Sequence, residues 1–413
     1  MRTMRRIAAL TTITVSAIAA TGCGAAGPAH PREHPVVLTA SQVSVLRAYG
    51  TGDTTFGLGM LSALCHDKPG SNVVVSPVSL ATGLGMAYLG ARGSTAAAMA
   101  RVLHLPNVTR SALIGGLHAR SALLGSLGRP GVAFSASDRI WADPSLPTNP
   151  GFVAALKSGY QAGLTHVPLL SQPEQSRQRI NAAIAADTHG HISHLLRPGS
   201  LSQIGWVLTD ALYLDARWAH PFNHALTGPG TFRTAGGQVT AHYMNGESFA
   251  VARSGGWTAA ALPYRGHRLA MLALLPPAGN GCQVPATATV GALAAQLRTG
   301  HQRIAIALPK VSLATSESLN SVLAKLGMGI AFTDSADFKD LSPAACCIRF
   351  VQHAATLDVA EKGTVASAAT AVGVAPSSAM VTLQFDRPFL LLIRDSLTGE
   401  PLMLAWVANP SAH

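Results

Sequence analysis

The 413-residue sequence is poor in charge, in aromatic side chains and in cysteine. Charged residues make up 12% and aromatic residues 5%, whereas 48% of the chain is hydrophobic. Little charge with much apolar content excludes a disordered chain and provides for a large core. Because no repeat of fixed period and no long low-complexity segment occurs, a repeat architecture is not predicted, and the length allows one large domain or two ordinary ones.

Motifs of common hydrolases are also missing. The sequence holds no Gly-x-Ser-x-Gly elbow, no Ser-x-x-Lys pair and no His-Glu-x-x-His. Ser76, Ser79, Asp210 and His353 are residue types that can form a catalytic triad. Since neither serine lies in a nucleophile motif, we predict no catalytic residue and no enzyme.

The N-terminus has an apolar run, Ile7 to Ala20, that is too short to span a bilayer comfortably. It follows three arginines, Arg2, Arg5 and Arg6, which together with the apolar run are typical of an export signal. We therefore predict that residues 1–22 are an export signal and that the protein acts at the cell surface or outside the cell.

The signal ends in Thr21-Gly22-Cys23, which resembles a bacterial lipoprotein signal. In such signals the cysteine is acylated and becomes the new N-terminus, so Cys23 is predicted to hold the protein on the membrane surface. Residues 23–40 begin rich in Gly, Ala, Pro and His and are predicted to be a flexible tether. The alternative is plain secretion, with Cys23 incidental.

Basic residues exceed acidic ones by 30 to 19, giving a formal net charge of +11. The arginines are scattered, so we predict no nucleic-acid surface and favour a solvated basic surface over a polyanion site. The spacing of His189, His191 and His194 could suit a metal ion. A solvated turn is the favoured interpretation, so neither a metal nor another cofactor is predicted.

Four cysteines follow Cys23, and an even number in an exported protein permits disulfides. Adjacent cysteines rarely bond to each other because of ring strain, so Cys346 and Cys347 are expected to need distant partners. The pairing with Cys65 and Cys282 is left open, and free buried thiols are an equal alternative.

Helices are predicted mainly in the first half and strands mainly in the second, an α+β pattern in one large unit. A Ser-Pro start after a short strand favours a helix from residue 76 to 90. The expected helices cover residues 41–65, 76–90, 95–103 and 318–328, and the expected strands cover residues 73–75, 206–218, 268–277, 303–313 and 388–410, the last with a turn at 396–400.

Five motifs, in order, resemble the serpin family over roughly Ser41 to Pro410. They are NVVVSPVSLATGLGMAYLGARGST, INAAIAADTHGHISHLL, LTDALYLDARWAHPF, HAATLDVAEKGTVASAATAV and FDRPFLLLIRDSLTGEPLMLAWVANP. The resemblance implies an α+β serpin domain, residues 41–413, with a large central mixed sheet, two smaller sheets, about nine helices and an exposed reactive-centre loop at 361–384. The protein is expected to be a monomer.

Most serpins inhibit serine or cysteine proteases. The loop is cleaved as bait, and it then inserts as a new strand into the central sheet while the protease is still acylated. The resemblance therefore implies a suicide-type inhibitor whose partner is a serine protease in a covalent acyl complex. A non-inhibitory binding or carrier protein is the alternative.

The loop hinge begins at Glu361 and has small, uncharged residues at every second position. If Thr364 points inward, so do Ala366, Ala368 and Thr370, because alternate residues of a strand face the same side. A charge in this set would be buried without a partner, at a cost of several kcal/mol. Gly363 is predicted to supply a flexible hinge. This pattern favours an inhibitor.

The spacing of the family's motifs implies that the bait bond, which the protease cleaves, is Ser377-Ser378. Counting forward from Glu361 and counting back from Phe385 give the same bond. A serine in the bait position suits the shallow pocket of elastase-like or subtilisin-like proteases. Neighbouring bonds after Val374, Ala375 or Met380 stay open.

The resemblance also implies a shutter, a hydrogen-bonded cluster where strands of the central sheet part, formed by Ser76, Ser79, Asp210 and His353. The family usually has Asn where this chain has Asp210, and an ionised Asp only accepts hydrogen bonds. His353 could donate to it, which would make the shutter sensitive to pH. Trp218 is assigned to the breach, where insertion begins.

Overall fold

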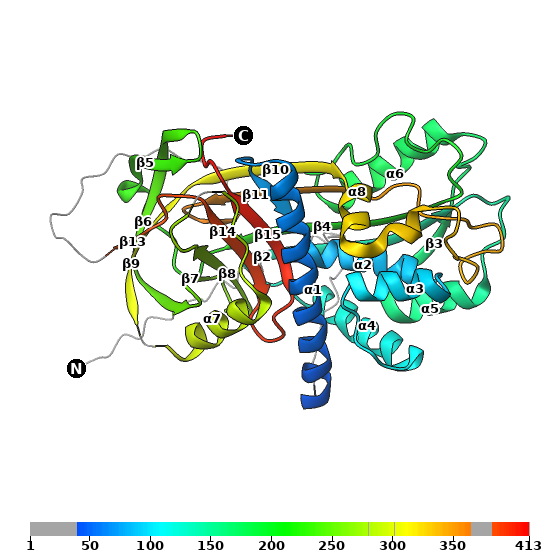
Figure 1. The fold of residues 1–413 in the computed structure, drawn as a ribbon, viewed down its shortest axis with the longest axis horizontal. Helices are drawn as coiled ribbons and strands as arrows, with labels where there is room; N and C mark the ends of the chain where they lie inside the picture. The colour runs from blue at the N-terminus through cyan, green and yellow to red at the C-terminus, as the bar shows by residue number, and fades with distance from the viewer. Residues whose placement is uncertain (1–38, 280, 301, 365–381, 413) are drawn as a thin grey trace, which may run out of the picture. The chain divides into compact units, whose positions relative to one another are not determined.

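A computed structural model describes residues 39–279, 281–300, 302–364 and 382–412 (Figure 1). The predicted export signal, nearly all of the tether and Cys23 lie outside these ranges. The described residues belong to one compact unit. No described helix is both long and apolar enough to cross a membrane.

The described ranges contain eight α-helices, close to the nine or so expected. Thr39 caps the first of them in a capping box with Gln42, and Ser76 caps the second, whose first residue is Pro77. The second helix begins where its Ser-Pro signal places it, and the first begins one residue before the expected residue 41. The helices are α1 (Ala40–Asp67), α2 (Pro77–Tyr88), α3 (Gly93–Val102), α4 (Arg110–Gly125), α5 (Pro150–Tyr160), α6 (Pro173–Asp187), α7 (Thr287–Thr299) and α8 (Asn320–Leu323).

Six strands form the central sheet. Its order is β10-β11-β12-β4-β2-β3, and all neighbours are antiparallel except β2 and β3. The predicted mixed sheet is thus confirmed. Its strands are β2 (Val132–Ala142), β3 (Gly163–His166), β4 (Trp206–Arg217), β10 (Val311–Ser318), β11 (Gln352–Ala360) and β12 (Gly363–Thr364).

Nine further strands correspond to the two smaller sheets, which are continuous with each other and form one nine-stranded sheet. The long β6 joins them, because its last part pairs with β7 while its earlier parts pair with β5 and β9. The strands are β1 (Val73–Val75), β5 (Gly228–Thr234), β6 (Gly237–Ser254), β7 (Trp257–Pro263), β8 (Leu269–Leu275), β9 (Arg303–Pro309), β13 (Thr382–Gln384), β14 (Phe389–Asp395) and β15 (Pro401–Val407).

The single strand expected over residues 303–313 is wrong. The segment forms β9 and β10, which belong to different sheets and are separated at Lys310. Pro309 has no N–H with which to continue a ladder, and the Lys310 N–H donates to the carbonyl of His242 at 2.8 Å. The chain therefore leaves one sheet here and enters the other.

Hydrophobic side chains cover both faces of the central sheet. On one face, Ile180 and Ile184 of α6 pack with Trp141 and Val207 of the sheet in a cluster of their own. On the other face, α2 lies against β4 and β15. A strand placed in the middle of this sheet is therefore buried on both sides.

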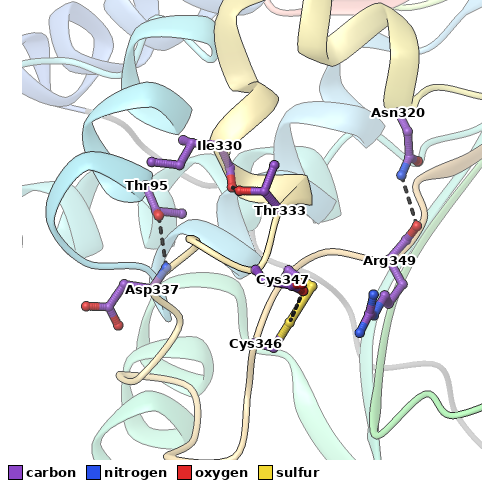
Figure 2. Close-up of a disulfide and its surroundings, with 9 residues drawn as sticks. Thr95, Asn320, Ile330, Thr333, Asp337, Cys346, Cys347 and Arg349 are labelled. Carbon is purple, nitrogen blue, oxygen red and sulfur yellow. Dashed lines mark hydrogen bonds between the residues drawn. A yellow bond between two sulfur atoms is a disulfide. The ribbon is translucent and has the colours of Figure 1, made fainter.

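Both disulfides join cysteines that follow the tether. Cys65 at the end of α1 bonds to Cys282 ahead of α7, with 5.9 Å between the Cα atoms. Cys346 bonds to Cys347, so the expectation of distant partners for this pair is wrong (Figure 2). The pair lies in an irregular connection outside any strand, where adjacent side chains need not point to opposite sides.

Candidate functional site

The central sheet has an opening between β4 and β11, which we define as the space between these strands beyond β12. Within the described residues, β4 and β11 each pair with the two-residue β12 and not with each other. Gly363 and Thr364 lie between Ala360 and Val359 on one side and the end of β4 on the other. We call the β12 end the upper end of the opening.

Thr364 is buried at the upper end. Its side chain is 2% exposed, and its hydroxyl lies 2.6 Å from the hydroxyl of Tyr264. The ring of Tyr264 stacks on Trp218 with 4.5 Å between centroids, and the Trp218 indole N–H donates to the Ala360 carbonyl at 2.9 Å. Trp218, assigned to the breach from sequence, thus lies where β12 enters the sheet.

Gly363 fits the narrow space between the strands because it has no side chain. A Cβ here would lie 2.8 Å from the Cα of Arg217 and closer still to the Ala216 carbonyl, and the φ angle of +156° is one that other residues rarely adopt. The predicted hinge glycine is therefore a position of close backbone approach. Any larger residue would push β12 out of register.

Glu361 anchors the turn between β11 and β12. Its carboxylate accepts hydrogen bonds from Lys310 at 3.1 Å and Thr227 at 3.0 Å, and its backbone carbonyl accepts the N–H of Phe222. Burial by itself would raise the pKa of Glu361, but hydrogen bonds from its own backbone N–H, Lys310 and Thr227 outweigh burial and lower it. The charged form is thus held in place.

Within the predicted loop, Glu361 of the turn and Thr364 of β12 are buried rather than exposed, and residues 382–384 form β13, parallel to β9. The rest of the predicted site in this segment lies outside the described residues, namely Ala366, Ala368, Thr370, Ser377 and Ser378. Their roles stay predictions.

The opening continues beyond Thr364 as a cavity of about 50 Å³. Side chains of β4 and β11 flank it, including Leu214 and Leu357. It leads toward a larger cavity of about 320 Å³ between α2, the start of β4 and residues 344–353, lined mainly by apolar side chains. Among the described residues, both cavities thus lie along the line that β12 begins.

Ser76, Ser79 and His353, three of the four residues assigned to the shutter, come together at the opposite end of the opening, which we call the lower end. The Ser76 hydroxyl donates to the Leu402 carbonyl at 2.8 Å and accepts the N–H of Ser79 at 3.3 Å. The Ser76 backbone N–H donates to Nε2 of His353 at 3.2 Å. These contacts join α2, β11 and β15, three elements distant in sequence.

This cluster does not have the arrangement of a nucleophile and its base. His353 accepts a backbone N–H rather than the Ser76 hydroxyl, and burial lowers the pKa of His353 to about 4. The imidazole is therefore neutral at neutral pH. Asp210 lies in β4, but its side chain is outside the described part, so the predicted pairing with His353 stays a prediction.

The three histidines after α6 do not gather into a metal site. The rings of His189 and His191 pack against Tyr213 of β4, with centroids 4.7 and 5.1 Å away. In the described ranges, one group of three ligand-type side chains lies close enough to hold a metal ion, and it contains none of these histidines.

Sequence reasoning missed Tyr264, Lys310 and Thr227, which hold the hinge. Tyr264 contacts a residue 100 positions away in the chain, and Thr227 one that is 134 positions away. Local pattern carries no signal for such contacts. The one available signal is that the five motifs occur in the family's order, which indicates that the segments of these residues belong to a single domain.

Comparison with known proteins shows that this chain is similar to serpins. Residues 51–410 match the family described as "Serpin (serine protease inhibitor)". The chain is 32% identical to a serpin-like protein of Thermococcus kodakarensis (82% of this chain, 81% of that one) and 30% identical to Serpin B6 of Macaca fascicularis (86% and 98%). It is 29% identical to the leukocyte elastase inhibitor of Bos taurus (87% and 98%).

Solved structures with the same fold include human kallistatin, at TM-score 0.75 and 22% identity, covering 90% of this chain and all of that one. Human thyroxine-binding globulin with thyroxine has TM-score 0.72 and 21% identity, covering 89% and 100%. At these identities the likeness shows the fold alone.

Proposed function

Because this chain belongs to the serpin family, we propose that it is a suicide-type inhibitor of serine proteases that acts by cleavage and insertion of its reactive-centre loop. One observation carries the proposal. The loop hinge is already a strand of the central sheet, with Thr364 buried in antiparallel register between β11 and β4.

Extending that register predicts the inserted state. Ala366 would lie between Leu357 and Leu214, and both of these partners are buried, as Thr364 is. Two residues further, Ala368 would lie between Ala355 and Leu212, and then Thr370 would reach His353 and Asp210. Small uncharged side chains fit these positions, whereas a charge would be buried without a partner.

Insertion is strongly favourable in energy. On the order of ten ladder hydrogen bonds would form, each worth about 1 kcal/mol net. Apolar surface would be buried as well, at roughly 25 cal/mol per Å². The total exceeds about 10 kcal/mol, enough to distort a docked protease and displace its nucleophile from the oxyanion donors. Serpin loop insertion is itself a known example of strand addition.

The proposed bait bond is Ser377-Ser378, and the proposed targets are elastase-like or subtilisin-like enzymes. A small serine side chain fits a shallow specificity pocket and gives no cation for a trypsin-like one. The bovine relative with 29% identity is named leukocyte elastase inhibitor, and that name is consistent with an elastase-like target. Mass spectrometry of the released C-terminal peptide tests the bond, since a new N-terminus other than Ser378 would refute it.

Incubation with elastase and with subtilisin tests the function. A covalent complex that survives SDS is the expected result. Cleavage of the loop without a complex would instead support a non-inhibitory binding protein, a function that family members such as thyroxine-binding globulin make a specific alternative.

We also propose that the protein is exported and held at the cell surface by acylated Cys23. The proposal rests on the basic start, the short apolar run and the Thr-Gly-Cys end of the signal. Metabolic lipid labelling should mark the wild type and not Cys23→Ser. Equal labelling of the two would refute it.

A further inference from the structure

Two adjacent cysteines, which also line the cavity of about 320 Å³, lie beside a carboxylate. We propose that Cys346, Cys347 and Asp334 form a redox-controlled site for one thiophilic divalent metal ion of the Zn²⁺ type. The ion would bind after the Cys346–Cys347 disulfide is reduced.

The three side chains already lie together. Both sulfur atoms and a carboxylate oxygen of Asp334 fall within 4.8 Å of one another, and Sγ of Cys346 is 3.7 Å from Oδ1 of Asp334. Asp334 is exposed and Cys347 half-buried, so an ion can reach them from solvent. Two thiolates, a carboxylate and one water make up a four-coordinate set that zinc accepts.

Backbone hydrogen bonds hold the two ligand-bearing segments against each other. The Ile348 N–H, next to the cysteine pair, donates to the Ala331 carbonyl at 2.9 Å. The turn that carries Asp334 closes through the Ala336 N–H and the Thr333 carbonyl at 3.0 Å. Figure 2 shows this turn and the disulfide in one view. The ligands therefore stay near each other without the sulfur–sulfur bond.

The covalent link does little for the stability of the fold. A disulfide stabilises mainly by restricting the unfolded chain, and more so for longer loops. Cys65–Cys282 spans a sequence separation of 217, whereas Cys346–Cys347 spans one. The adjacent pair can thus open and close without unfolding the domain, as a reversible metal site requires.

The chemistry balances with a dithiol as reductant. The dithiol gives two electrons and two protons to the disulfide, which becomes two thiols while the dithiol becomes a cyclic disulfide. The divalent ion then replaces the two thiol protons, which leave to solvent, and binds two thiolates. Asp334 adds one carboxylate oxygen as the third protein ligand.

Cobalt titration of the full chain tests the site. The protein is reduced with dithiothreitol, freed of reductant without oxygen and titrated with Co²⁺, whose thiolate bonds absorb in the near ultraviolet. We expect saturation at one equivalent, displacement of Co²⁺ by Zn²⁺, and no absorbance with the oxidised protein. Absence of the band from the reduced wild type would overturn the proposal.

Matched variants locate the ion. Cys346→Ser/Cys347→Ser should abolish the band, and Asp334→Asn should weaken binding by more than about 10-fold, the loss typical even of outer-shell partners. A band that persists in the double variant would assign the ion to the other cysteines, Cys23, Cys65 and Cys282, and would refute the site. Unchanged affinity in Asp334→Asn would refute the three-residue set. Circular dichroism checks that each variant folds.

Discussion

The two ends of the opening in the central sheet are held in different ways. At the upper end, the chain of the loop itself fills the sheet, with Thr364 bonded to Tyr264 and Glu361 held by Lys310. At the lower end, His353 and Ser76 join neighbouring elements beside a cavity of about 320 Å³. The upper end is held by contacts of the hinge residues Glu361 and Thr364. The lower end is held by the contact between Ser76 and His353, which the inserting loop would reach last.

This difference separates the start of insertion from its completion. Residues at the upper end decide whether the hinge is seated, while those at the lower end decide what the advancing loop displaces. Four measurements test that division, and the effect we expect falls from the first to the last.

Cleavage of the reactive-centre loop should raise the thermal stability of the protein. Insertion worth more than about 10 kcal/mol would raise the thermal midpoint by more than about 10 °C in a chain of this size. Differential scanning calorimetry before and after a single cut within residues 365–381 measures this. An unchanged midpoint would show that the upper end is seated but that the strand goes no further.

Thr364→Arg should convert the inhibitor into a substrate. A buried, unpaired guanidinium costs about 3 kcal/mol or more, which corresponds to roughly 100-fold less covalent complex. SDS gels of complex against cleaved chain give the ratio. Thr299→Arg makes the same change at an exposed helix end and should inhibit normally. Equal inhibition by the two variants would contradict insertion at Thr364.

Acid should lower the free energy of unfolding, because His353 at the lower end is buried in its neutral form. Its pKa of about 4 in the folded state is below the ordinary 6.5, so the neutral side chain contributes stability that is complete above pH 6.5 and is lost as pH falls toward 4. The loss amounts to roughly 3 kcal/mol. Urea unfolding of the wild type and His353→Gln at both ends of this range should differ by that amount. Parallel curves would exclude a neutral buried histidine.

Tyr264→Phe should loosen the upper end by the smallest amount. Loss of its hydrogen bond to Thr364 costs about 1 kcal/mol, or about 5-fold faster hydrogen exchange at the Thr364 amide. Tyr243→Phe loses a similar bond, to the Thr231 carbonyl, away from the opening. It should leave that amide unchanged, and equal acceleration in both variants would be evidence against a role for Tyr264 in seating the hinge.

Sequence predicted the parts of this site that local rules control. The Ser76-Pro77 start of α2 follows from capping chemistry. Strand alternation places Ala366, Ala368 and Thr370 on the same side as Thr364, although the inward direction of Thr364 itself is a premise of that argument. The lower cluster of Ser76, Ser79 and His353 came from the family resemblance. In each case a short stretch of residues, or an ordered motif, carries the information.

Long-range packing could not be predicted in this way. Nothing around Arg120 indicates that it lies buried between Asp53 and Glu400, 67 and 280 positions away. The same holds for the change of sheet after Pro309 and for the Cys346–Cys347 disulfide. Both depend on the conformation of backbone outside regular strands and helices, which the surrounding elements determine. Such features are set by the assembled fold.

The tight turn at Glu361 and Lys362 has a kinetic consequence. Starting a new strand normally requires a chain to reverse direction and find its partners, and the entropy lost is recovered only by later bonds. Here the reversal is complete before any protease arrives, so zippering can proceed from a nucleus that already exists. We therefore expect the speed of inhibition to depend on how readily the contacts of Ser76 and His353 at the lower end give way, rather than on a search by the loop.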